Sequence, residues 1–180
     1  HVLYRHRSFD GKELRFDSRS GPLAVRRVGD ALELDFPVKA TSAAHTPAGL
    51  TSALGAQPNE VHDGHYLLCV LQDEEAVQTL NPDIRELELM HAHAVIVTAR
   101  GDEVDFVSRF FAPRMGVPED FATGSAHCML APYWATKLKR KKLKARQLSV
   151  RGGEIDCEVK GDRVLLRGHA VTFIEGEINA

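Results

Sequence analysis

The 180-residue sequence contains few cysteines, no marked excess of either charge and no long hydrophobic run. Its three cysteines, Cys69, Cys128 and Cys157, are far apart and form no Cys-x-x-Cys pair, which argues against a disulfide framework or a zinc site. We expect plain thiols and therefore a reducing, cytoplasmic location. The net charge of −2 provides no general attraction to nucleic acid or to a membrane surface, so neither is an expected partner.

Sequence signals for cofactors, metals and membrane segments are also missing. The apolar run at residues 92–99 is far too short to cross a bilayer, and no signal peptide is visible. There is no P-loop and no Gly-x-Gly-x-x-Gly fingerprint, so we expect no nucleotide cofactor. The histidine pairs at 62/65 and 91/93 lack a third ligand at a metal-binding spacing, and we predict that the chain holds no metal.

One basic run, at residues 137–146, could indicate a nucleic-acid or localisation patch. The other interpretation is a solvated helix end, where cations complement the helix dipole. The near-neutral total charge and the lack of interleaved aromatic residues favour the helix end.

Short apolar segments separated by turn residues predict a strand-rich chain of the α+β class with mixed or antiparallel sheets. Residues 37–47 are expected to be a linker. Pro132 lies inside the longest predicted helix, which should therefore be irregular or kinked. The expected helices are 47–54, 74–80 and 124–141, and the expected strands are 14–16, 22–28, 31–36, 66–71, 93–98, 104–111, 146–150, 155–159, 164–167 and 170–174.

The most informative segment runs from Glu119 to Trp134. An acidic pair leads into a turn of small residues, and that turn opens the longest predicted helix. Free backbone N–H groups at a helix start form an anion site, which the helix dipole strengthens. Asp120 lies five residues before Ser125, close enough to flank the same site. We therefore expect a small anionic substrate to bind here beside an acid/base group.

Several motifs in order closely resemble the phenazine biosynthesis PhzF-like family. They are Ser108–Pro113, Gly116–Asp120, Thr123–His127, Tyr133–Trp134, Gln147–Gly153 and Glu175–Gly176. The resemblance implies the diaminopimelate-epimerase-like fold: two lobes, each a curved mixed sheet around a central helix, with the active site between them. Residues 1–38, with a last strand at 169–180, would form a partial first lobe, and residues 39–168 would form the second.

The start of the chain looks like the tail of the first lobe's central helix. Family members carry a further segment before it, with a catalytic glutamate and a Gly-His-Ala turn, so the family's main acid/base group matches no residue here. Phe121 stands where the family usually has proline, which should alter only the stiffness of the turn.

The resemblance strengthens a catalytic or substrate-positioning role for Asp120, whose alternative is an ordinary carboxylate at a helix start. Ser125 is the second catalytic candidate. It has no nucleophile-elbow motif, and binding a carboxylate through its hydroxyl and N–H suits it better than attack. The expected substrate-binding residues are Thr123, Gly124, Ser125, Ala126 and His127.

Two of these residues carry alternatives. Thr123 stands where related racemases and epimerases carry a catalytic cysteine, which argues against a two-thiol racemase. His127 either lines the cleft or caps the helix locally.

Together these features predict an isomerase, independent of cofactors, that moves a proton on a small substrate bearing a carboxylate. The alternative is a non-catalytic binding or scaffold protein that retains the fold. A homodimer is possible, as in the family that the chain resembles.

Overall fold

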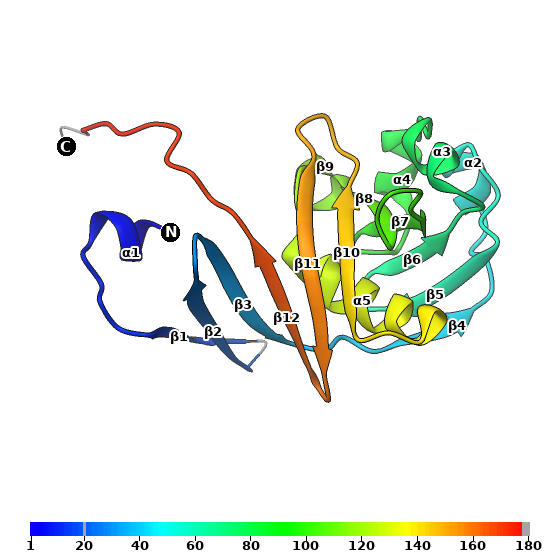
Figure 1. Cartoon of the computed structure of the whole chain (residues 1–180). Helices are drawn as coiled ribbons and strands as arrows, with labels where there is room; N and C mark the ends of the chain where they lie inside the picture. Colours follow the sequence, from blue (N-terminus) through cyan, green and yellow to red (C-terminus); the bar gives the residue numbers. More distant parts are fainter. Residues whose placement is uncertain (20, 178–180) are drawn as a thin grey trace.

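The computed structural model describes residues 1–19 and 21–177 as an α+β fold built on one long sheet (Figure 1). The strands are β1 (Glu13–Ser18), β2 (Gly21–Val28), β3 (Ala31–Pro37), β4 (Thr41–Ala44), β5 (Glu60–Gly64), β6 (Leu67–Val70), β7 (Val95–Arg100), β8 (Phe106–Ala112), β9 (Val117–Asp120), β10 (Lys142–Gln147), β11 (Gly153–Lys160) and β12 (Arg163–Gly168). The helices are α1 (Val2–His6), α2 (Leu50–Leu54), α3 (Glu74–Gln78), α4 (Ile84–Leu89) and α5 (Gly124–Leu138), with a 3₁₀ turn, η1, at Pro113–Met115.

The sheet is mixed and runs in the order β1-β2-β3-β12-β11-β10-β8-β7-β6-β5-β4, with β9 paired to β8. Most neighbours are antiparallel, and the two parallel pairs are β6 with β7 and β8 with β10. The β3–β12 ladder joins the amino-terminal strands to the rest of the sheet (Figure 1).

Helix α5 lies at the centre of the larger hydrophobic core, and the sheet curves around it (Figure 1). Its apolar residues are spread around the helix instead of forming one stripe, which is typical of a helix that is buried on most sides. Met129 and Leu130 have no exposed surface, and Trp134 stacks on Phe106 of β8 at 5.9 Å between ring centroids. The arrangement confirms the expected α+β class with a curved mixed sheet around a central helix.

A second core lies between strands β6–β8 and the short helices α2, α3 and α4. Leu54, Val77 and Leu87 supply one apolar residue from each helix, and they pack with Val97 and Phe111 of the sheet. Strands β6–β8 are therefore buried on both faces, which explains their nearly continuous apolar sequences.

The amino-terminal strands are held to β12 by charged pairs across the ladder. Glu33 is only 5% exposed, and its carboxylate forms ion pairs with Arg167 at 2.5 Å and with Arg26 at 3.6 Å. Asp35 forms an ion pair with Arg163 at 2.7 Å. Cross-strand pairs of opposite charge stabilise a sheet, and here they compensate the burial of the Glu33 carboxylate.

Pro132 is accommodated within α5 by a contact from outside the helix. Because proline has no N–H, the carbonyl of Cys128, four residues earlier, lacks its usual helical donor. The backbone N–H of Lys39, in the segment between β3 and β4, donates to that carbonyl at 3.0 Å. The helix therefore continues through Pro132 as far as Leu138.

Two of the predicted segments are wrong. Residues 37–47 contain β4, which pairs with β5, instead of forming only a linker. Residues 169–177 form no strand, because the β3–β12 ladder ends at Leu32 and Gly168 and no other strand in the described residues lies beside them. Residues 178–180 of the predicted last strand lie outside the described residues.

Other boundaries differ by a few residues. The strand expected at 146–150 lies at Lys142–Gln147, and α5 ends at Leu138 instead of 141. Strands β5 and β9 and helix α4 were not predicted. The division into lobes at residues 38/39 and 168/169 stays a prediction. Within residues 1–19 and 21–177, none of the helices combines the length and the apolar character that crossing a membrane requires.

Candidate functional site

The candidate site is the turn between β9 and α5. Asp120 is the last residue of β9, which is held beside the buried strand β8. Thr123 is the N-cap of α5, in an extended backbone conformation, and the helix begins at Gly124. The turn therefore places Asp120 beside the start of the most deeply buried helix, as the sequence predicted.

The first amides of α5 are unpaired. Thr123 makes no side-chain capping bond to them. Within the described part of the chain, the N–H groups of Gly124, Ser125 and Ala126 have no acceptor, whereas the N–H of His127 donates to the Thr123 carbonyl at 3.4 Å. Three free N–H groups at the positive end of a helix dipole form a surface that suits a carboxylate.

Asp120 is half-buried and oriented by two hydrogen bonds within its own turn. The Phe121 N–H donates to Oδ1 at 2.8 Å, and the Thr123 hydroxyl donates to Oδ2 at 2.6 Å. The Thr123 hydroxyl is thereby used to orient Asp120 instead of capping the helix, which leaves the helix amides free.

Ser125 contacts a residue that sequence reasoning did not select. Its hydroxyl oxygen lies 3.0 Å from the hydroxyl oxygen of Tyr66. Tyr66 is buried, with its ring edge-on to Phe110 at 5.0 Å between centroids. No histidine lies within hydrogen-bond distance of Ser125 in the described residues, so the geometry favours ligand binding over nucleophilic attack.

A lysine lies over the ring of Tyr66. The ammonium of half-buried Lys39 lies 5.3 Å from the centroid of the Tyr66 ring. Burial lowers the pKa of Lys39, and the Cys128 thiol acts in the opposite direction. No carboxylate of the described residues lies within salt-bridge distance of this ammonium, which adds positive potential near the start of α5.

His127 caps the helix locally. Its side chain is fully buried, and Nδ1 lies 2.8 Å from the Thr123 carbonyl, to which it donates. Burial lowers the pKa of His127 to about 4, so the ring is neutral near pH 7. In this arrangement the side chain supports the N-cap and has no exposed surface for a ligand.

The cysteines are free and buried, which confirms the expectation of plain thiols. Burial raises the pKa of Cys128 to about 11 and that of Cys69 to about 12. Both therefore stay protonated near pH 7, and neither is poised to act as a proton-accepting thiolate. Within residues 1–19 and 21–177, no group of three or more potential metal ligands is found.

Gln147 is the most important residue that the sequence did not indicate as functional. It lies at the end of β10 with no exposed surface, and its side chain contacts both Asp120 and Thr123. It begins the Gln147–Gly153 motif, but nothing in that motif shows where its side chain points. Tyr66 and Lys39 carried no local signal at all.

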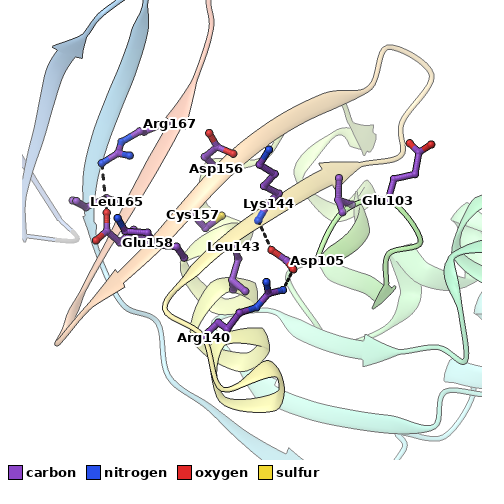
Figure 2. A pocket seen from close by; sticks show the side chains of 12 residues that line it. Glu103, Asp105, Arg140, Leu143, Lys144, Asp156, Cys157, Glu158, Leu165 and Arg167 are labelled. Carbon is purple, nitrogen blue, oxygen red and sulfur yellow. Dashed lines mark hydrogen bonds and ion pairs between the residues drawn. The ribbon is translucent and has the colours of Figure 1, made fainter.

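A cavity of about 430 Å³ lies over strands β10, β11 and β12 (Figure 2). Its charged side chains include Lys144, Asp156, Glu158 and Arg167. Arg167 pairs with Glu158 at 3.5 Å. Acidic and basic side chains are therefore mixed in this cavity, which does not present the positive surface that would attract a small anion. Neither this cavity nor four others, of about 400 to 800 Å³, is lined by residues 118–130. The candidate site is therefore separate from all five.

Comparison with known proteins gives one consistent result. The family model of the PhzC-PhzF phenazine biosynthesis-like proteins matches residues 1–176. A Pseudomonas aeruginosa protein named as an uncharacterized isomerase is 48% identical over 99% of this chain and 69% of its own length. A second P. aeruginosa protein with the same kind of name is 45% identical over 92% of this chain and 64% of its own length.

Solved structures agree with the sequence comparison. A PhzF-family protein of Enterococcus faecalis superposes with a TM-score of 0.94 at 42% identity, covering 99% of this chain and 69% of that protein. A predicted epimerase of P. aeruginosa has a TM-score of 0.64 at 20% identity, covering 93% of this chain and 67% of that protein, which shows a shared fold.

Proposed function

Because this chain belongs to the PhzC-PhzF phenazine biosynthesis-like family, we propose that it forms the larger part of an isomerase that moves a proton on a small carboxylate-bearing substrate. The observation that carries the proposal is the set of three unpaired amides at the start of α5, next to the half-buried carboxylate of Asp120. The isomerase names of the relatives support the reaction class.

The proposed roles follow from the positions of the groups. The amides of Gly124, Ser125 and Ala126, with the Ser125 hydroxyl, bind the substrate carboxylate. Asp120 orients the substrate or takes part in proton transfer, since it is half-exposed and held by donors on its protein side. Only a proton moves, so the reaction requires no redox or group-carrying cofactor.

Thr123 and His127 act on the shape of the site. The Thr123 hydroxyl orients Asp120, and the His127 ring holds the Thr123 carbonyl. The chain matches 64 to 69% of the length of its P. aeruginosa relatives. The family's glutamate corresponds to no residue here, so we propose the activity for the complete protein in which this chain occurs. A homodimer remains a prediction.

The test is incorporation of solvent deuterium into a panel of small amino and cyclic carboxylic acids by the complete protein. We expect label in at least one acid, and a rate reduced by at least about tenfold in Asp120→Asn, because an acid/base group contributes about 10²–10⁴-fold. Asp156→Asn, which changes an exposed aspartate on β11, is the matched control and should exchange at the parent rate. An absence of label from every acid would contradict the proposal, as would a full rate in Asp120→Asn.

A second candidate function is a non-catalytic binding or scaffold protein with the same fold. It is favoured by the apolar side chains of the carboxy-terminal segment, where Val171, Phe173 and Ile174 are 77 to 90% exposed. Exposed apolar clusters of this kind are typical of surfaces that another polypeptide covers. Saturable binding of a small carboxylate without any deuterium exchange would support this alternative.

A further inference from the structure

We propose that Gln147 is a positioning residue that sets the orientation of the Asp120 carboxylate through Thr123. The inference rests on the function proposed above for Asp120. Gln147 belongs to β10, 24 residues beyond Thr123, and its side chain has no exposed surface. A buried amide without hydrogen-bond partners destabilises the folded chain, so a polar side chain buried to this extent is expected to form hydrogen bonds.

Both ends of the Gln147 side chain are used. Oε1 accepts from the Thr123 N–H at 2.8 Å, and Nε2 donates to the Asp120 carbonyl at 2.7 Å. The chemistry of these partners fixes the orientation of the amide, since a backbone N–H only donates and a carbonyl only accepts. The reversed amide would place two donors together at Thr123 and two acceptors together at Asp120.

The fixed amide also determines the direction of the Thr123 hydroxyl. Gln147 Nε2 lies 3.2 Å from Thr123 Oγ1 and donates to it. With an incoming donor on its oxygen, the hydroxyl directs its own proton to Asp120 Oδ2 at 2.6 Å. The chain of donors runs from Gln147 to Thr123 and from Thr123 to the carboxylate. Gln147 therefore orients the Asp120 carboxylate through Thr123, although its own side chain contacts only the backbone carbonyl of Asp120.

The sheet gives this relay a rigid base. Gln147 is paired with Ser108 in the parallel β8–β10 ladder, and β8 also pairs with β9, which carries Asp120. A displacement of about 1 Å in a reacting group can lower a rate by about 10²-fold. Loss of the Gln147 amide should therefore reduce the turnover that depends on Asp120 more than it reduces carboxylate binding by the α5 amides.

The experiment compares Gln147→Met, which keeps the side-chain length and removes both hydrogen-bonding groups, with Thr123→Val, which removes only the hydroxyl. Amide signals of the ¹⁵N-labelled protein are the readout. In Gln147→Met we expect the amide protons of Thr123 and Phe121 to move upfield. In Thr123→Val we expect the residue-123 amide proton to stay downfield, since its bond to Gln147 Oε1 is kept. We expect the Phe121 amide proton to move, since that amide reports on the Asp120 carboxylate. Gln78→Met, at an exposed position, is the matched control.

A Phe121 amide that stays in place in Thr123→Val would overturn the proposal, because Gln147 would then hold the turn without acting through the hydroxyl. This variant decides the question even if Gln147→Met does not fold. On the turnover side, Gln147→Met should lower kcat by at least about tenfold with KM changed less than about twofold, and should add nothing further in the Asp120→Asn background. A complete absence of deuterium exchange in the parent protein would refute the proposed function, while the amide shifts would still decide the relay.

Discussion

The hydroxyl of Tyr66 lies 3.0 Å from the hydroxyl of Ser125, so the residue that precedes strand β6 contacts the first turn of α5. These two residues are 59 positions apart in the chain. Tyr66 is held by the edge-on contact with Phe110, and it fixes the direction of the Ser125 side chain from outside the helix. The start of α5 therefore has one support from Tyr66 and another from Gln147.

The Tyr66–Ser125 contact predicts a measurable coupling between the two side chains. Tyr66→Phe removes the phenolic hydroxyl and keeps the buried ring, so the free energy of unfolding should fall by about 1 kcal/mol. Urea denaturation of Tyr66→Phe, Ser125→Ala and the double variant should give a coupling of about 0.5–1 kcal/mol. Tyr133→Phe is the matched control, because the Tyr133 hydroxyl donates to Glu60. Its effect on the free energy of unfolding should be additive with that of Ser125→Ala. If the effects of Tyr66→Phe and Ser125→Ala are additive, the contact between the two hydroxyls does not contribute to the free energy of unfolding.

Burial of His127 predicts a loss of stability in mild acid. Its pKa is about 4 in the folded chain against an ordinary 6.5, so the unfolded chain binds the proton more readily. The neutral ring therefore contributes its full stability above about pH 6.5, and this contribution is lost as the pH falls toward 4, to an extent of roughly 3 kcal/mol. Urea unfolding at about pH 7.5 and about pH 4.5 should show a shallower pH dependence in His127→Asn than in the parent.

The His127 prediction has an internal control. His91→Asn changes an exposed histidine and should keep the pH dependence of the parent. If the free energy of unfolding changes equally with pH in the parent and in His127→Asn, the imidazole is not buried in its neutral form.

Gly153 should be sensitive to a single added methyl group. A Cβ at this position would lie 2.9 Å from the Cβ of Ala122, in the turn that leads to Thr123. Gly153→Ala should displace that turn and cost about 1–3 kcal/mol of unfolding free energy. In Gly168→Ala the nearest atom is 3.7 Å away, so this variant should be tolerated. Equal stability of the two variants, with an unshifted Thr123 amide in both, would contradict the packing described here.

Local sequence signals predicted the start of α5 correctly, because they act within a few residues. The small residues at Thr123–Ala126 open the helix, and Asp120 lies just before them in the sequence, as the last residue of β9. The order of motifs identified the family and, through it, the curved sheet around a central helix.

Features that depend on distant partners could not be predicted. Residues 170–174 have the composition of a strand, but a strand needs a neighbour, and the ladder with β3 has already ended. Pro132 predicted an irregular or kinked helix, but only the structure shows that the N–H of Lys39 donates to the Cys128 carbonyl, which Pro132 leaves without its helical donor. The roles of Gln147 and Tyr66 likewise become visible only when β10 and the residue before β6 are brought to the start of α5.

The proposed function requires that the free amides at the start of α5 bind a small carboxylate beside Asp120. The decisive measurement is an NMR titration of the ¹⁵N-labelled complete protein with a panel of small carboxylic acids, at constant ionic strength set with chloride. We predict that at least one acid moves the amide signals of Gly124, Ser125 and Ala126 in a saturable manner. Amide signals that stay in place for every acid, or that move equally with chloride, would show that these amides are not a carboxylate site.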